Sequence, residues 1–145
     1  MTELKFLSFK DIDGLNFQSA YEMLTMAVTE LYRRHLYLMG SDMINKYDKI
    51  SIARIMEGTA SSAEIKGSLA MLIRSVSAHF GRPVIFLLDE YDVPVAKASS
   101  RGYYDEMMDV IRPMLSMALK DNSLLKFAVM TDIVLAIQMS IVHGT

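Results

Sequence analysis

Cysteine is absent from this 145-residue chain, which excludes disulfide bonds, thiolate catalysis and cysteine-ligated metal sites. Long apolar runs are missing as well, since no segment approaches the roughly 20 residues that a membrane-spanning helix needs. Basic residues are not in excess either, because the net charge is −2 and the pI is near 5.9. Binding to nucleic acid through a general positive field is therefore not expected.

The start of the chain also lacks the features of a signal peptide, because residues 1–14 contain acids and no long apolar core. The absence of cysteine fits a reducing compartment. Together these features predict a soluble cytoplasmic protein.

Apolar residues, in contrast, make up 52% of the chain. A chain of this length and composition can bury the core of one ordinary domain, so we expect residues 1–145 to form one. Methionine occurs 13 times, mostly at helix-spaced apolar positions. We therefore interpret the methionines as core-filling residues rather than as a special surface.

The most informative stretch is 84–92, with the sequence VIFLLDEYD. Its unbroken apolar run is typical of a strand buried on both faces, as in a parallel sheet. Asp89, Glu90 and Asp92 follow at the carboxyl end of that strand, where open α/β sheets bind ligands. One interpretation is a Walker B strand, whose first acid serves a nucleotide-bound magnesium ion. The other is a buried strand that enters an acidic turn.

Helical periodicity and turn residues divide the chain into helices and strands. The pattern predicts a strand at 84–88, a loop over 89–102, a helix over 103–120 and a strand at 127–131. That order is a βαβ unit, so its two strands should be parallel neighbours. Pro113 should kink or divide the helix. Further elements are predicted as a strand at 4–9 and helices at 17–39, 51–56 and 61–80.

Two helix starts have capping signals. Asn16 is a plausible N-cap for the first helix, and Ser19 with Glu22 offers an alternative capping box. Ser61 and Glu64 form a capping-box pattern at the start of the helix over 61–80.

Other polar residues have simple structural interpretations. We interpret Lys10, Asp11 and Asp13 as parts of a solvated loop. His35 has no acid or cysteine at ligand spacing, which makes a metal-binding role improbable. His79 lies beside an apolar stripe, so a structural role is favoured over a catalytic one.

With these residues in view, the chain resembles the AAA-ATPase-like family of bacterial P-loop proteins, which are often joined to a PD-(D/E)XK nuclease-like domain. The resemblance covers nearly the whole chain. Its most specific stretches are LLDEYDVPVAKA at 87–98 and GYYDEMMDVIRPMLSMALKDN at 102–122. Shorter matching stretches are FLSFKDIDGLN at 6–16, AYEML at 20–24, ELYRRH at 30–35 and KFAVMT at 126–131.

The resemblance implies a site for Mg²⁺ and ATP. Asp89 would orient the magnesium ion, Glu90 would polarise the attacking water, and Thr131 would be a sensor near the γ-phosphate. The chemistry agrees, because phosphoryl transfer needs charge neutralisation and in-line positioning more than covalent catalysis. Asp92 and Pro94 belong to the same motif, and we expect them to shape the loop.

The chain also departs from the family pattern. A P-loop requires G-x-x-x-x-G-K-[ST] to hold phosphates, and no Gly-Lys pair occurs in this sequence. Asp132 replaces the family's glycine after the last strand, while Leu135 and Gln138 stand where basic residues are usual. The implied fold is therefore a partial P-loop NTPase-like parallel sheet of about three strands flanked by helices. We expect an internal piece or a degenerate relative of an ATPase domain.

Three functions are compatible with these observations. The first is an ATPase-like domain that is not competent alone. The second is a non-catalytic module that pairs with itself, or with a full-length relative, through an exposed sheet edge. The third is a metal-dependent nuclease using Asp89, Glu90 and Asp92, although no lysine or histidine follows at a suitable spacing. Carboxylates alone would hold Mg²⁺ weakly, because this ion usually takes ligands from substrate phosphates.

Overall fold

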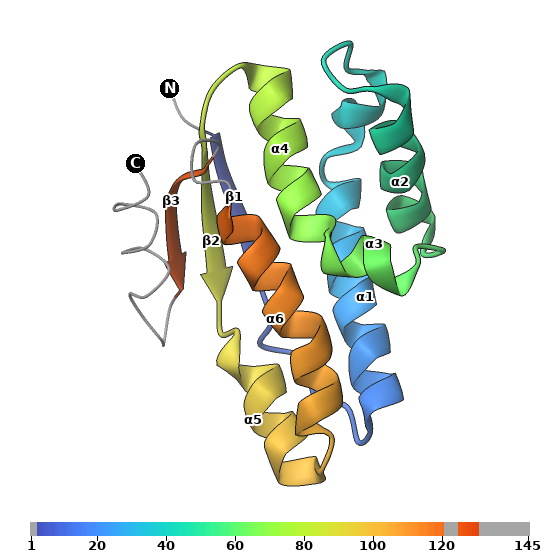
Figure 1. Ribbon diagram of the computed structural model, residues 1–145, viewed down its shortest axis with the longest axis vertical. Helices are drawn as coiled ribbons and strands as arrows, with labels where there is room; N and C mark the ends of the chain where they lie inside the picture. Colours follow the sequence, from blue (N-terminus) through green and yellow to red (C-terminus); the bar gives the residue numbers. More distant parts are fainter. Residues whose placement is uncertain (1–2, 121–124, 131–145) are drawn as a thin grey trace.

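The computed structural model describes residues 3–120 and 125–130, which form a mixed α/β fold (Figure 1). The α/β class predicted from the sequence is confirmed. None of the helices in these two ranges is long and apolar enough to cross a membrane. In chain order the elements are β1 (Glu3–Ser8), α1 (Phe17–Arg33), the 3₁₀ helix η1 (Leu36–Gly40), α2 (Lys46–Glu57), α3 (Ser62–Lys66), α4 (Ser68–Phe80), β2 (Val84–Asp89), α5 (Asp92–Arg101), α6 (Tyr104–Lys120) and β3 (Leu125–Met130).

The strands form one parallel sheet in the order β1-β2-β3, with β2 in the centre (Figure 1). β1 pairs with β2 in register as far as Ser8 beside Asp89. β3 pairs with the other side of β2, as far as Met130 beside Leu88. The prediction that the strands of the βαβ unit are parallel neighbours is therefore confirmed.

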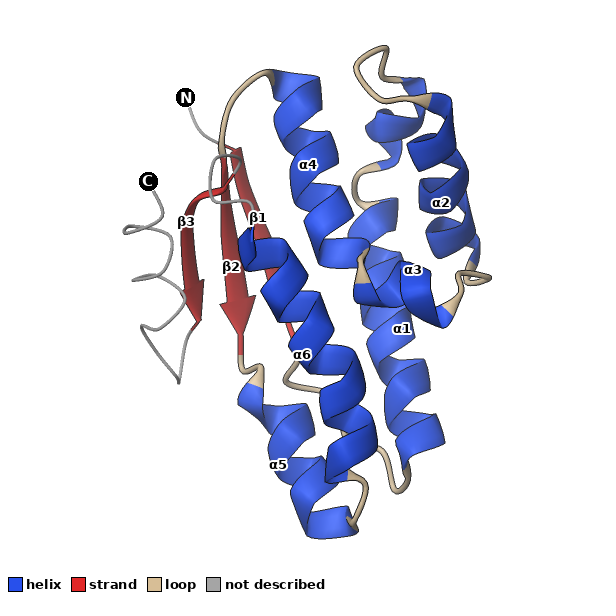
Figure 2. Ribbon diagram, in the orientation of Figure 1, coloured by secondary structure: helices blue, strands red, loops and turns tan. Residues whose placement is uncertain are grey.

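The helices lie together on one side of the sheet (Figure 2). Burial along β2 follows from this arrangement: Val84, Phe86 and Leu88 are buried, whereas Ile85 and Leu87 are only half-buried. The prediction of a strand buried on both faces is therefore wrong for the second face, because the described helices cover only the first.

The core lies between the sheet and helices α1, α4 and α6. Tyr32 of α1 is fully buried there, and its hydroxyl donates a 2.6 Å hydrogen bond to the Ser68 carbonyl at the start of α4. Burial raises the pKa of this phenol far above its ordinary value, so Tyr32 remains a neutral donor. The buried helix residues include Leu24, Val28 and Leu31 of α1, Leu69, Leu72 and Val76 of α4, and Met107, Ile111 and Met114 of α6.

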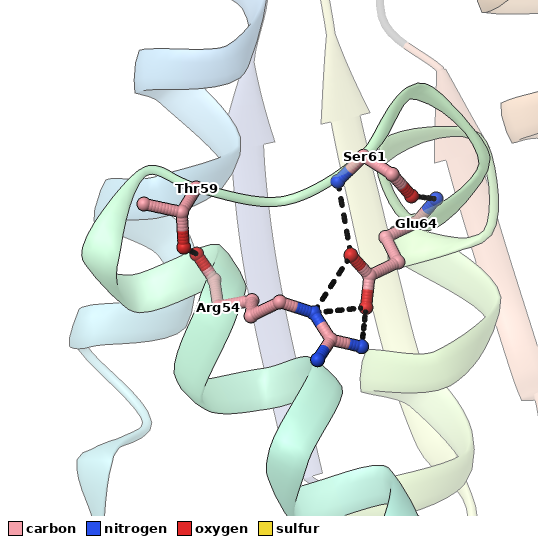
Figure 3. Close-up of polar contacts among 4 residues, drawn as sticks. All are labelled: Arg54, Thr59, Ser61 and Glu64. Atoms are coloured by element: carbon pink, nitrogen blue, oxygen red, sulfur yellow. Dashed lines mark hydrogen bonds and ion pairs between the residues drawn. The ribbon is translucent and has the colours of Figure 1, made fainter.

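The connection between α2 and α3 is fixed by a capping box and an ion pair (Figure 3). The Glu64 N–H donates to Ser61 Oγ at 3.1 Å, and the Ser61 N–H donates to Glu64 Oε1 at 2.9 Å. Arg54 of α2 donates from Nη2 to Glu64 Oε2 at 2.6 Å. The capping box predicted for Ser61 and Glu64 is confirmed, and the same carboxylate also anchors α2.

The first long helix is shorter than predicted. Its N-cap is Asn16 as expected, since Asn16 Oδ1 accepts the Ser19 N–H at 2.9 Å. The helix ends at Arg33 instead of continuing to residue 39. The His35 side chain explains this end. In a continuing helix the Leu31 carbonyl would accept the backbone N–H of His35, but here the His35 Nδ1 lies 2.7 Å from that carbonyl.

Two other helices also differ from the prediction. The helix over 61–80 is divided into α3 and α4 at Gly67, which is the weakest helix former in that segment. α2 is longer than the predicted 51–56, because Asn45 caps it by accepting the Asp48 N–H at 2.8 Å.

The segment after β2 contains more helix than predicted. The loop over 89–102 is mostly α5, and Gly102, with φ of 84°, forms its left-handed C-terminal cap. α6 runs through Pro113 without being divided.

Candidate functional site

The acids singled out in the sequence lie at the carboxyl end of β2. Asp89 is the last residue of this strand and pairs with Ser8, the last residue of β1. The pairing continues one step further, because the Phe9 N–H donates to the Asp89 carbonyl at 3.0 Å. Asp89 therefore lies at the carboxyl end of a parallel sheet, which is where open α/β folds bind ligands.

Glu90 follows in a left-handed conformation with φ of 51°, a value that no other non-glycine residue in the described ranges approaches. An L-residue in this conformation costs about 1 kcal/mol or more. The turn directs the chain from β2 into α5, where the Val93 N–H donates to the Glu90 carbonyl at 3.2 Å. Strained backbone of this kind concentrates at functional sites, which makes Glu90 a functional candidate on physical grounds.

Asp92 and Pro94 lie in the first turn of α5 rather than in the predicted loop. An acid there suits the positive end of the helix dipole, and a proline there removes no helical hydrogen bond. Asp92 Oδ1 is buried and accepts no hydrogen bond from a described residue. Burial, and secondly the charge of Asp92, raise the pKa of the adjacent Tyr91. Asp92 and Pro94 therefore belong to the start of α5, while Asp89 and Glu90 are the acids at the carboxyl end of β2.

The loop after β1 is held against α5 and α6. Asp13 lies 2.9 Å from Arg101 Nη1 and 3.7 Å from Lys97 Nζ, and the closer contact is an ion pair without hydrogen-bond alignment. The Gly14 carbonyl accepts hydrogen bonds from Arg101 Nη1 at 3.0 Å and from the Tyr103 hydroxyl at 2.6 Å. Asp13 lies in a loop with a 40% exposed side chain, as interpreted, but it also forms ion pairs with α5, which the sequence did not predict.

Within the ranges that the structure describes, no group of three or more histidine, aspartate or glutamate side chains is placed to hold a metal ion. His35 is buried against the Leu31 carbonyl, and His79 Nδ1 lies 2.7 Å from Ser41 Oγ. Asp89 and Glu90 therefore fit a magnesium ion only where phosphate oxygens and water supply most of the ligands.

The comparison with family models covers nearly the whole chain. The model of a family described as predicted AAA-ATPase matches residues 5–142. This chain belongs to that family. The resemblance inferred from the sequence is confirmed, whereas no curated protein and no solved structure matches the chain.

The third residue that the resemblance implies for the site is Thr131, which lies outside the described residues. β3 ends one residue earlier, at Met130. Met130 pairs with Leu88, the residue before Asp89. The carboxyl ends of β2 and β3 therefore lie at the same end of the sheet.

The structure also has a pocket of about 380 Å³ between the end of β1 and α1. Met23 and Met26 of α1 are 41% and 65% exposed at this pocket, so the interpretation of methionines as core residues fails for them. The sequence signal was available, because both lie off the buried stripe that contains Leu24 and Val28. The complete lining is Leu7, Ser8, Asp11, Ile12, Met23, Met26, Ala27, Glu30 and Arg34.

Proposed function

We propose that this predicted AAA-ATPase domain supplies the Walker B half of an ATP site and is not competent for hydrolysis by itself. The observation that carries the proposal is the Asp89-Glu90 pair at the carboxyl end of the central parallel strand. Family membership supports it, because ATP and Mg²⁺ are used by AAA-ATPases in general. A parallel sheet with helical crossovers is also the architecture on which P-loop sites are built.

The two acids would have different duties. Asp89 would accept hydrogen bonds from water bound to a magnesium ion, and Glu90 would hold the attacking water. When bound, Mg²⁺ would neutralise charge on the nucleotide phosphates. Glu90 is the residue at which the backbone turns from β2 toward α5, directly after Asp89.

The proposal of incompetence rests on the missing phosphate cradle. No Gly-Lys pair is present in the sequence, so these residues provide neither P-loop backbone N–H groups nor the phosphate-binding lysine. Two carboxylates without that cradle would repel the phosphates of free ATP and hold Mg·ATP only weakly.

Calorimetric titration with Mg·ATP tests competence. We expect no saturable heat at submillimolar nucleotide and no hydrolysis above the buffer rate. Hydrolysis that Glu90→Gln abolishes would contradict the claim of incompetence, while supporting the assigned role of Glu90.

A second measurement tests the acids even when binding is weak. Mn·ATP at millimolar concentration should broaden the backbone amide NMR signals of residues 8–11 and 89–92 in the wild-type chain. Asp89→Asn should remove this broadening, whereas the control Asp105→Asn, at an exposed acid in the first turn of α6, should not. Equal broadening in both variants would contradict the role of Asp89.

We also propose a second candidate function, a non-catalytic module that pairs through its sheet edge with a second copy or a full-length relative. The supporting observation is that β1 lies at one end of the strand order and pairs only with β2 among the strands that the structure describes. Unpaired strand edges readily recruit another strand. Weak association is detected at protein concentrations of roughly 5–500 µM. Over this range, light scattering should show an average mass that rises with protein concentration. A constant monomer mass would argue against self-pairing.

A further inference from the structure

The end of β1, the turn that follows it and one face of α1 line a pocket, which we call the β1–α1 groove. We propose that this groove binds an extended peptide segment that carries an apolar anchor residue flanked by basic residues. The inference rests on the second candidate function above and specifies which edge is used and what chemistry the partner has.

The backbone of β1 provides the first part of the argument. β1 lies at the end of the strand order and pairs only with β2 among the strands that the structure describes. Its outer N–H and C=O groups therefore have no strand partner in those ranges. Such an edge selects an extended chain, because only an extended backbone continues the hydrogen-bond ladder.

The pocket provides the second part. Its volume of about 380 Å³ lies at the lower end of the roughly 300–1,000 Å³ typical of ligand pockets. Leu7 of β1 is buried, while Met23 and Met26 form the partly exposed apolar wall on α1. Methionine adapts its shape to a partner, so this wall can accept a leucine or methionine side chain.

The length of the groove limits the partner. Its α1 wall runs from Met23 to Arg34, which is about 16 Å at 1.5 Å per residue. An extended chain covers that length with about five residues. In a strand of that length alternate side chains point the same way, so the central anchor can enter the pocket with the flanking residues at the rim.

Charge indicates the flanking residues. Asp11 and Glu30 are exposed at the pocket, and neither forms an ion pair with a described residue. Arg34 lines the same pocket but already makes an interaction within the chain. Two exposed carboxylates, beside an arginine that is already engaged within the chain, favour lysine or arginine on the partner. They disfavour an anion such as a nucleotide.

The test is fluorescence anisotropy of the full chain with the labelled pentapeptide Lys-Val-Leu-Val-Lys. We expect saturable binding with a Kd of about 10–100 µM, as for a short segment with one anchor. Met26→Lys should weaken binding at least tenfold. Met43→Lys is the matched control and should leave binding unchanged, because Met43 is 64% exposed, close to the 65% of Met26, and lies outside the pocket.

Two altered peptides test the mode of binding. A peptide N-methylated at alternate amides keeps its side chains but loses ladder hydrogen bonds, and should bind at least tenfold more weakly. Glu-Val-Leu-Val-Glu should also bind more weakly, with a difference that shrinks in 0.5 M salt. Unchanged binding of the methylated peptide, or of the parent peptide to Met26→Lys, would overturn the proposal.

Light scattering distinguishes this failure from failure of the second candidate function. If no peptide binds while the chain self-associates in a way that Met26→Lys abolishes, a second copy occupies the groove and the peptide proposal is wrong. If no peptide binds and the chain stays monomeric, the peptide proposal is wrong and pairing of the chain with itself is contradicted as well.

Discussion

Among single residues, Glu90 combines a functional assignment with an unfavourable backbone conformation. Glycine adopts φ of 51° without strain, whereas alanine has the same steric conflict as glutamate. We expect Glu90→Gly to be more stable than Glu90→Ala by about 1 kcal/mol, measured by urea denaturation. Both variants lose the carboxylate, so the difference in their stability reports only the cost of the backbone conformation at residue 90. Equal stability of the two variants would show that residue 90 does not adopt this conformation in solution.

Glu64 is the residue whose charge should make stability depend on pH. The Arg54 hydrogen bonds, and then the Ser61 N–H, lower the pKa of this carboxyl to about 2. A lowered folded-state pKa means that the stabilisation is present above the ordinary value of 4.5 and disappears as the pH falls toward 2. The Arg54 side chain is 47% exposed, so solvent screening keeps the effect small.

Glu64→Gln tests this charge effect, because glutamine retains an oxygen that can accept the Ser61 N–H. The variant should be less stable than the wild type by less than about 1 kcal/mol at pH 7. The difference should shrink between pH 4.5 and 2 in thermal unfolding. A difference that does not change with pH would contradict the assignment.

At the scale of the elements, the loop from β1 to α1 approaches the helix too closely for any side chain at Gly14. A Cβ on Gly14 would lie 2.3 Å from the backbone nitrogen of Ala20, and backbone cannot move aside cheaply. We expect Gly14→Ala to destabilise the fold by at least about 2 kcal/mol, measured by thermal or urea unfolding. Gly40→Ala is the control, because a Cβ there meets no atom within 4 Å. Similar effects in both variants would contradict this packing.

For the whole molecule, the strand order predicts which backbone amides are best protected. β2 has a strand on each side, whereas β1 pairs only with β2 in the described part of the chain. Hydrogen exchange should therefore be slowest in β2 and faster in β1, because edge amides open without disrupting the sheet. Binding of the pentapeptide should slow exchange in β1. Protection of β1 equal to that of β2 in the free chain would mean that its outer edge is already covered.

Local patterns predicted the features that depend on neighbouring residues. The N-cap at Asn16, the capping box of Ser61 and Glu64, and the apolar run of β2 all follow from short stretches of sequence. The helix boundaries that differ from the prediction depend on single local residues, such as Asn45 as an N-cap and His35 in contact with the Leu31 carbonyl. Side-chain contacts between segments that are distant in the sequence were not predicted at all. The ion pairs of Asp13 depend on α5, which is far away in the sequence.

The sequence by itself therefore determined the α/β class, the membership in the predicted AAA-ATPase family and the position of Asp89 and Glu90 at the end of a strand. These depend on periodicity and on residues that are adjacent along the chain. Only the tertiary structure decided the strained turn at Glu90, the contacts that hold the Gly14 loop, and the exposure of Met26 at the pocket beside the end of β1. The physical reason is that strain, burial and exposure depend on which segments pack together, and in this fold those segments are far apart in the chain.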